Sequence, residues 1–385
     1  MKKALFFISK HLLTAVFAVV LIVAFLSPFF VDSDHMDENR RMAEFPSKID
    51  IDFPKIFESY YMDNFPNRKK LIRRYSKTRF KKFGINNYLV FGDNDWLFYN
   101  SKVREPTDTI GDYLGTNKLT QKLLESNVDH LVKEIGHMQG LGAEVYVMIV
   151  PNKATVYSEI MPDDYKGRQA EESKAEQIMK ALKERGVKVV ESKDAIVKAK
   201  EKGNTYYRTD THWNNWGAYA SYKELEKALI KNKVKGVRPI NVVKMEKVEK
   251  SCGDLQKYLF LSDSCKDENW EITYDRPMNA ECKNTGRGKL PLDSEEVTCF
   301  ANVKDGKKLV VVRDSFADAM MPMLSTQFGK SVYLWRGHAE NKYIRDRIIE
   351  EKPDIIVLEY LERFVGHIAN NIFESERGRG IEPPS

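Results

Sequence analysis

Several features that would assign a function directly are missing from this 385-residue sequence. It contains no zinc-finger, RNP-like or helix-turn-helix signature and no internal repeat. Lys and Arg number 62 against 56 Asp and Glu, so the net charge of +6 is only mildly basic. Nucleic-acid-binding domains combine a clustered basic surface with a recognisable motif, and we therefore expect no nucleic-acid partner.

Cysteine is scarce, with four residues that all lie between Cys252 and Cys299. None belongs to a C-x-x-C pair and none has a histidine nearby, so a zinc site is not predicted. Two disulfides in an exported protein are the preferred interpretation, with free buried thiols as the alternative. Four cysteines allow three pairings, and their spacing does not choose among them.

Charge is absent from residues 12–31, a run long enough to cross a bilayer core as a helix of about 20 residues. Lysines precede the run and acidic residues follow it, which places the rest of the chain outside the cytoplasm. A cleaved signal peptide is the alternative, but its apolar core is usually shorter, and no small-x-small cleavage site follows. We therefore predict a single-pass signal anchor in residues 1–31 and an extracytoplasmic body, periplasmic or at the cell surface.

Residues 32–110 are expected to hold a polar leading segment, a basic helix over 67–83 and a hairpin over 88–99. The hairpin pattern is two short apolar runs that flank Gly-Asp-Asn-Asp at 92–95. The basic helix is interpreted as a solvated helix face, and binding to anionic lipid headgroups or an anionic polymer is the alternative.

Residues 111–375 alternate short apolar runs with amphipathic stretches, which predicts an α/β fold with a mostly parallel sheet covered by helices on both faces. Strands are expected at 144–150, 187–190, 308–313, 331–335 and 354–360. Helices are expected at 116–141, 169–185, 194–202, 216–231, 316–328 and 342–351. Residues 235–305 are interpreted as an irregular, disulfide-bearing insertion or cap, and residues 376–385 as a disordered tail.

Histidine is also rare, and among the seven in the chain only His212 follows an aspartate at a spacing of two. On an extended backbone, residues two apart point the same way, so Asp210 and His212 are expected to share one cleft. A serine nucleophile needs a histidine to take its proton and a carboxylate to orient that histidine. An Asp-x-His metal half-site is the alternative, but no third and fourth ligands are evident, and no metal is predicted.

The expected nucleophile is Ser315, which follows an apolar strand and precedes a helical pattern. Active sites in parallel sheets lie at the carboxyl ends of the strands, and a serine N–H at a helix start favours an oxyanion. Asp-Ser-Phe alone is a weak motif, because serine is also a common helix cap. Together with Asp210 and His212, it predicts a catalytic triad.

In this order, the motifs resemble the alginate O-acetyltransferase family of the AlgJ and AlgX type, which has an SGNH-hydrolase-like domain. As in that family, Asp and His precede Ser, the reverse of ordinary SGNH hydrolases. The family usually has a small residue where this chain has Arg313. The matching blocks are Asp-Glu-Asn-Arg at 37–40, Gly-Asp-Asn-Asp-Trp-Leu-Phe at 92–98, Pro-Asn-Lys-Ala-Thr-Val-Tyr at 151–157, Asp-Thr-His-Trp-Asn at 210–214, Gly-Asp-Leu at 253–255 and Asp-Ser-Phe at 314–316.

The resemblance implies catalytic roles for Asp210, His212 and Ser315, and a membrane-bound O-acyltransferase partner that passes acetyl groups outward. The expected reaction forms an acetyl-enzyme on Ser315 and then acetylates a hydroxyl of an exopolysaccharide or cell-wall glycan, with no cofactor of its own. Oxyanion donors are expected from Ser315, with Gly253 and Asn152 as further candidates. Candidate substrate contacts are Trp213, Arg208 and Arg313.

Two alternative functions remain open at this point. An acetyl-esterase would use the same triad, because transfer and hydrolysis share one acyl-enzyme. A non-catalytic polysaccharide assembly subunit would use the basic helix over 67–83 and the aromatic loops instead.

Overall fold

The computed structural model divides the chain into two compact units, Met1–Asn86 and Asn87–Ser385. The predicted motif at 37–40, most of the basic helix over 67–83, Cys265 and the tail over 376–385 lie outside the described residues. The structure describes residues 2–27, 43–68, 71, 74–75, 78, 87–103, 105–258, 266–284, 296–304, 306–336, 341–367 and 372–373.

The smaller unit contains helices α1 (Lys2–Leu26) and α2 (Phe53–Asp63). The membrane-spanning helix predicted within residues 1–31 is not confirmed, because no helix in the described part of the chain is both long and apolar enough to cross a membrane. The uncharged run over residues 12–31 and helix α1 have different bounds. Helix α1 begins among the N-terminal lysines and ends at Leu26, five residues before the run does.

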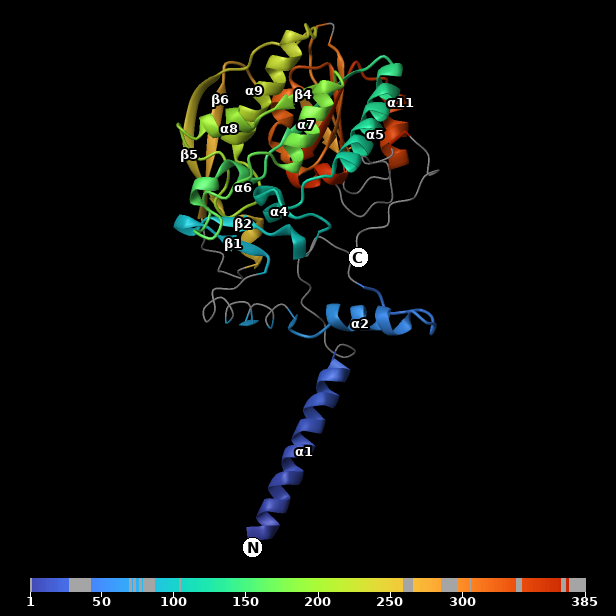
Figure 1. Cartoon of the computed structure of the whole chain (residues 1–385), viewed down its shortest axis with the longest axis vertical. Coiled ribbons are helices and arrows are strands. Elements are labelled where there is room, and N and C mark those ends of the chain that lie inside the picture. The colour runs from blue at the N-terminus through green and yellow to red at the C-terminus, as the bar shows by residue number, and fades with distance from the viewer. Residues whose placement is uncertain are drawn as a thin grey trace. The chain divides into compact units, whose positions relative to one another are not determined.

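A seven-stranded mixed sheet forms the centre of the larger unit (Figure 1). The order across the sheet is β4 (Lys188–Glu191), β3 (Glu144–Val150), β11 (Ile355–Leu361), β9 (Lys308–Arg313), β10 (Lys330–Trp335), β8 (Glu296–Phe300) and β7 (Glu281–Asn284). The strands from β4 to β10 in this order run parallel, whereas β8 and β7 are antiparallel to their neighbours. The parallel arrangement is therefore limited to the first five strands.

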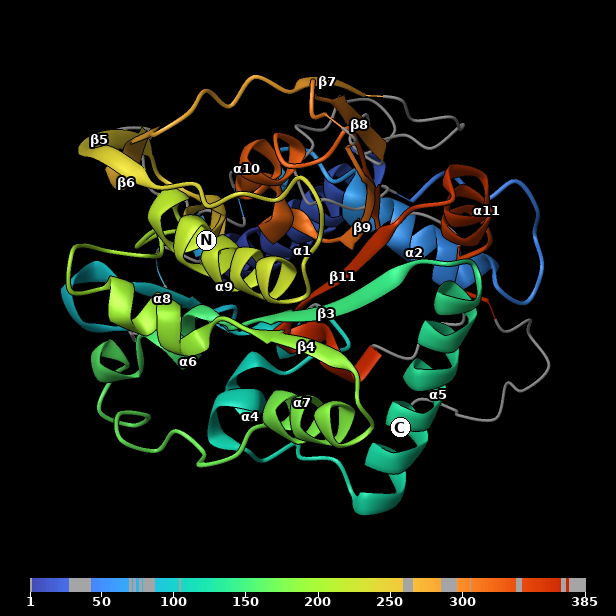
Figure 2. The same ribbon diagram turned by 90° about the horizontal axis from the view of Figure 1, so that it is seen from above.

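Helices cover both faces of this sheet (Figure 2). The α-helices are α4 (Thr109–Leu114), α5 (Gln121–Gly140), α6 (Lys153–Val156), α7 (Lys174–Glu184), α8 (Lys193–Ala199), α9 (Asn215–Lys231), α10 (Met321–Ser325) and α11 (Asn341–Glu351). Alternate residues of β3 point to opposite faces, so Val147 packs with α5, α7 and α11, while Met148 packs with α9 and α10 on the other side. Short 3-10 helices are η2 (Asp93–Asp95), η3 (Ser101–Val103), η4 (Ser158–Ile160), η5 (Asp254–Tyr258), η6 (Ser315–Ala319) and η7 (Glu362–His367).

The predicted hairpin is confirmed as β1 (Leu89–Phe91) and β2 (Leu97–Tyr99), which pair antiparallel. Asn94 and Asp95 adopt positive φ angles of 54° and 62° in the turn, a conformation that Asn and Asp tolerate better than most residues. The Asp-Asn-Asp run therefore supplies the residues that this turn requires.

Residues 235–305 are more regular than expected, so the prediction that they are irregular is wrong. They contain the exposed antiparallel ribbon of β5 (Val242–Ser251) and β6 (Lys266–Tyr274), and also β7 and β8 of the main sheet. The ribbon has few buried side chains, so its sequence lacks the apolar alternation that marks a half-buried strand.

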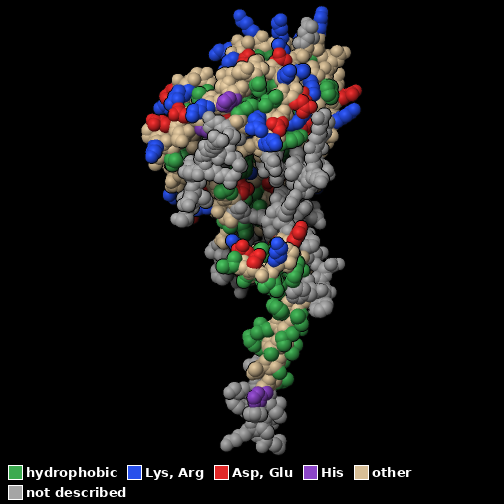
Figure 3. Space-filling model, turned by 90° about the vertical axis from the view of Figure 1, so that its right-hand side faces the viewer, with side chains coloured by type: hydrophobic (Ala, Val, Ile, Leu, Met, Phe, Trp, Pro, Cys, Tyr) green, Lys and Arg blue, Asp and Glu red, His purple; other side chains and the backbone are tan. Residues whose placement is uncertain are grey.

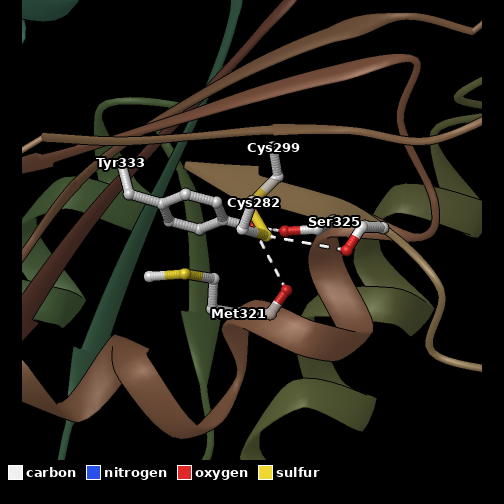
Figure 4. The surroundings of a disulfide bond; sticks show 6 residues. Cys282, Cys299, Met321, Ser325 and Tyr333 are labelled. Carbon is white, nitrogen blue, oxygen red and sulfur yellow. Dashed lines mark hydrogen bonds between the residues drawn. A yellow bond between two sulfur atoms is a disulfide. The ribbon is translucent and has the colours of Figure 1, made fainter. Parts of the chain in front are cut away.

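A disulfide joins Cys282 and Cys299, which face each other across β7 and β8. Next to it, the hydroxyl of Tyr333 on β10 lies 2.8 Å from the hydroxyl of Ser325 (Figure 4). Cys252 is also disulfide-bonded, and no described cysteine is free. The predicted disulfide chemistry is therefore present at the antiparallel edge of the sheet.

Two features of the fold prepare the candidate site. Strands β3, β9 and β11 are parallel neighbours, so the residues that follow Val150, Arg313 and Leu361 meet at one edge. The helix predicted over 316–328 is instead split into η6 and α10, with Pro322 in the first turn of α10. Proline suits the first turn of a helix but interrupts a helix interior, which accounts for the break.

Candidate active site

Three polar side chains form a hydrogen-bonded line beside the carboxyl end of β9. His212 Nδ1 lies 2.6 Å from Asp210 Oδ1, and His212 Nε2 lies 2.7 Å from Ser315 Oγ. Because a carboxylate only accepts hydrogen bonds, Nδ1 carries the proton, and Nε2 can accept from the serine hydroxyl. The His212 side chain remains 30% exposed, so solvent and substrates can reach this line.

The histidine lies on a closed loop between α8 and α9. A β-bridge joins Tyr206 to Trp213, and the Asn214 side chain then caps α9 by accepting two backbone N–H bonds. Within the loop, Asp210 Oδ1 also accepts the backbone N–H of His212 at 3.0 Å. The two-residue spacing thus lets one carboxylate oxygen bind both the backbone and the ring of His212.

The electrostatics of the pair favour an ionised Asp210 and a basic His212. Burial alone would raise the pKa of Asp210, but its hydrogen bond with His212 and the charge of that ring hold the pKa well below its usual range. Burial alone would lower the pKa of His212, but the hydrogen bond with Asp210 and the charges of Asp210 and Asp254 raise it above the ordinary value. The imidazole is therefore a better proton acceptor than a free histidine.

Two carboxylates from the 235–305 region, the buried Asp267 and the partly buried Asp254, bind the amide side of this loop. Asp267 accepts the N–H groups of Arg208 and Thr209 at 2.9 and 2.7 Å. Asp254 accepts the N–H and the hydroxyl of Thr211 at 2.8 and 2.7 Å. Neither carboxylate was predicted from the sequence to hold this loop. Asp254 had a signal, since it lies in the Gly-Asp-Leu block at 253–255, whereas Asp267 had none.

Ser315 begins η6, and the residue before it fixes the turn. Asp314 accepts the N–H of Phe316 at 2.9 Å and that of Leu361 at 3.0 Å. Its own N–H donates to Glu359 at 2.8 Å. Burial, and then the charge of Asp314, raise the pKa of Glu359 well above its ordinary value. The end of β9 is thus tied to β11 immediately before the serine.

The oxyanion candidates differ in availability. The backbone N–H of Ser315 has no hydrogen-bond acceptor within the described part of the chain. The side-chain nitrogen of Asn152 is buried and likewise has no partner among the described residues. The N–H of Gly253, in contrast, already donates to Thr209 Oγ1 at 3.0 Å. Gly253 is therefore not an available donor in this structure, which corrects the expectation.

Gly253 has a packing role instead. A Cβ atom at this position would lie 2.2 Å from Asp210 Oδ2, a distance that no real Cβ tolerates. Only glycine lets η5 approach Asp210 this closely. The Gly-Asp-Leu block is therefore a close-contact element beside the Asp210 carboxylate.

Of the three expected substrate contacts, only Arg208 remains available. Trp213 is 2% exposed, and its Nε1 donates to the carbonyl of Phe316 at 3.0 Å. Arg313 is 1% exposed and pairs with Asp318 at 2.6 Å. Both side chains are packed inside the protein, where a substrate cannot reach them. Arg208 is partly exposed and donates to the carbonyl of Lys266 at 3.1 Å.

Asp210, His212 and Asp254 offer ligand atoms within 4.8 Å of one another, the arrangement that a metal ion would need. Each residue is already hydrogen-bonded, however. Both oxygens of Asp254 accept from Thr211, and the Nδ1 atom of His212 is bonded to Asp210. An ion would have to displace these bonds, so we interpret the group as a hydrogen-bonded relay.

A cavity of about 490 Å³ lies elsewhere, near the carboxyl ends of β3 and β4, and its lining includes Ser192 and Glu362. None of Asp210, His212 and Ser315 lines it. The candidate site therefore lies outside this cavity, and its residues are identified by the hydrogen bonds that join them.

Residues 89–288, just over half of the chain, match the protein family described as SGNH hydrolase-like domain, acetyltransferase AlgX. The probable alginate O-acetylase AlgJ of Azotobacter vinelandii is 26% identical over 167 residues, which cover 42% of this chain and 39% of that protein. The protein of the same name from Pseudomonas syringae pv. tomato is 24% identical over 176 residues, which cover 46% and 42%. The match thus spans about two fifths of the length of these relatives.

The fold is shared with Bacillus cereus PatB1. The two structures superpose with a TM-score of 0.53 at 16% sequence identity, over 75% of this chain and 99% of that one. At this identity the likeness concerns the fold alone.

Proposed function

The chain belongs to the AlgX family of SGNH hydrolase-like acetyltransferases, and on this basis we propose that it is a serine O-acetyltransferase acting on a polysaccharide. The observation that carries the proposal is the line from Asp210 through His212 to Ser315, with 2.6 and 2.7 Å between its atoms. The names of the two AlgJ relatives, both probable alginate O-acetylases, support the reaction class.

In the first proposed step, Ser315 Oγ attacks the carbonyl carbon of an acetyl donor. His212 Nε2 takes the hydroxyl proton, and Asp210 stabilises the imidazolium that results. The bond between the acetyl carbon and the donor breaks, and the leaving group departs with the proton from His212. The product is an acetyl ester on Ser315.

In the second proposed step, a sugar hydroxyl attacks the acetyl ester while His212 Nε2 takes its proton. The ester bond to Ser315 breaks, the proton returns to Oγ, and the sugar leaves acetylated. The unpartnered N–H of Ser315 supports an oxyanion role in both steps, and the amide of Asn152 is the remaining candidate for a second donor.

We further propose that the acetyl group comes from a membrane-bound O-acyltransferase partner and that the reaction takes place outside the cytoplasm. The disulfide between Cys282 and Cys299 supports an oxidising compartment. The proposed acceptor is a hydroxyl of an exopolysaccharide or cell-wall glycan. No cofactor is required, because serine and histidine carry both steps.

The full chain incubated with 4-nitrophenyl acetate, with and without alginate or chitin oligosaccharides, tests this proposal. Mass spectrometry of the oligosaccharides and measurement of free acetate separate the possible outcomes. O-acetylated oligosaccharide with a matching decrease in free acetate is the expected result. Acetate release that no acceptor changes would identify an esterase, and oligosaccharide binding without any acetylation would identify an assembly subunit.

A further inference from the structure

A buried lysine lies directly beneath the catalytic loop. Lys153 is the first residue of α6, which follows β3 at the same sheet edge as Ser315. It is 5% exposed, although lysine is almost never buried without partners. Its environment therefore requires a specific explanation.

The ammonium group of Lys153 is saturated by backbone carbonyls of the catalytic loop. Nζ donates to the carbonyls of Tyr207, Arg208 and Asp210 at 3.0, 3.1 and 2.7 Å. An ammonium has three N–H donors, so each finds one acceptor. One side chain thereby fixes three carbonyls within four consecutive residues, the last of which carries the catalytic carboxylate.

The opposite side of the same segment is held by anions. Asp267 binds the N–H groups of residues 208 and 209, and Asp254 binds that of residue 211. The loop is thus held between one cation on its carbonyl side and two carboxylates on its amide side. A segment held in this way has little freedom to rotate its peptide groups.

The hairpin β1–β2 covers the lysine. The rings of Trp96 and Phe98 each lie 5.5 Å from Lys153 Nζ, a distance at which an aromatic face attracts a cation. The N–H of Leu97 also donates to the carbonyl of Arg208 at 3.0 Å. The Trp-Leu-Phe run at 96–98 therefore contacts both the ammonium group and the loop that it holds.

We propose that Lys153 is a positioning residue that holds the Asp210 backbone so that His212 stays in hydrogen-bond reach of Ser315. This inference rests on the proposed function. Lys153 acts through the loop, since the described structure shows no contact between its Nζ and the side chain of His212 or Ser315.

Two opposing effects act on the charged form of Lys153, which is disfavoured by burial and favoured by nearby carboxylates. Burial lowers the pKa of this ammonium to about 7, against the opposing charges of Asp210, Asp254 and Asp267. The neutral amine has only two N–H donors for three carbonyls. The loop is therefore held most firmly when Lys153 is protonated.

Replacing Lys153 by Met in the full chain tests the proposal, with Lys174→Met as the matched control. Lys174 is a second buried lysine, paired with Asp112 at 3.0 Å on the other face of the sheet. We expect kcat for 4-nitrophenyl acetate to fall about 10²-fold in Lys153→Met, because a displacement of about 1 Å at a catalytic group has that cost. KM should change little, since Lys153 does not touch substrate, and Lys174→Met should keep the wild-type kcat.

A second readout does not depend on activity. The NMR signal of the His212 Nδ1–H reports its hydrogen bond to Asp210, and we expect it to shift or broaden in Lys153→Met but not in Lys174→Met. Lys153→Arg should recover part of both readouts, because a guanidinium also offers several donors. If Lys153→Met does not fold, Lys153→Gln serves in its place.

The outcomes are distinct. A folded Lys153 variant with wild-type kcat and an unshifted His212 signal would overturn the proposal, as would equal losses of kcat in the Lys153 and Lys174 variants. A shifted signal in a protein whose wild type forms no acetyl-enzyme would support the positioning role and contradict the proposed function instead.

Discussion

The two halves of the candidate site are held in place by different means. Ser315 lies in a turn at the edge of the sheet, where the side chains of Asp314 and Glu359 accept backbone N–H groups and join the end of β9 to β11. The loop that carries His212 lies outside the sheet and is held by charged side chains from distant parts of the chain, above all Asp254 and Asp267. The serine is therefore positioned by contacts between neighbouring strands of the sheet, and the histidine by charged side chains from distant parts of the chain.

The largest loss of rate is expected when the histidine itself is removed. His212→Ala should lower the rate of acetyl-enzyme formation by about 10²–10⁴-fold, the usual contribution of a general base. The rate is measured by rapid mixing with 4-nitrophenyl acetate. His137→Ala, an exposed position on α5, is the control and should keep the wild-type rate. Loss of less than tenfold in His212→Ala would exclude this histidine as the base.

The next test loosens the loop and leaves the turn intact. Asp254→Asn keeps the size of the side chain but can no longer accept both the N–H and the hydroxyl of Thr211. We expect kcat to fall by up to about 10²-fold as the loop shifts, with little change in KM. Asp129→Asn, an exposed change on α5, is the control. A wild-type kcat in Asp254→Asn would mean that the loop does not depend on this charge.

The pH dependence provides a further distinction. Only neutral His212 can take the serine proton, so the rate should rise with pH through the pKa of His212, which lies above its ordinary value of about 6.5. The charge of Asp254 contributes to that shift, so the rising limb should move to lower pH in Asp254→Asn. Loss of the proton from Lys153, whose pKa is lowered to about 7, should oppose this rise at higher pH in both proteins. The measurement is kcat/KM between pH 5 and pH 9, a range of about four units around the ordinary pKa of histidine. A rising limb at the same pH in both proteins would contradict this account.

The smallest effect is expected on the serine side. Glu359 is buried and its pKa is raised well above its ordinary value, so the uncharged Glu359→Gln, which keeps an oxygen that can accept the Asp314 N–H, should replace it with little effect. We expect a nearly unchanged rate of acetyl-enzyme formation and a similar melting temperature. A large loss of rate would show that Glu359 is ionised and takes part in the electrostatics of the turn.

The same comparison explains what could be predicted from the sequence. Strand β9 and Ser315 were predictable, because an apolar run followed by a serine is a local pattern. The pairing of Asp210 with His212 was also local, since one carboxylate oxygen reaches both N–H groups of a residue two positions later. The α/β architecture followed from the alternation of strands and helices, although the antiparallel edge of β8 and β7 did not.

The missing parts of the prediction are long-range. Asp267 binds residues nearly 60 positions earlier in the chain, and no spacing rule marks such a contact. Lys153 lies within the matching block at 151–157, but its three hydrogen bonds to carbonyls of residues more than 50 positions away have no sequence signature. Trp213 and Arg313 were taken for substrate contacts because their burial depends on partners that only the fold brings together.

The most direct test of the central claim is the intact mass of the full chain after reaction with 4-nitrophenyl acetate, compared between wild type and Ser315→Ala. We predict a gain of one acetyl group in the wild type that is absent from Ser315→Ala, because Ser315 Oγ is the only atom of the protein that the proposed mechanism acetylates. Equal acetylation of both proteins, or none in a folded wild type supplied with the proposed membrane partner, would contradict the assignment of Ser315 as the nucleophile.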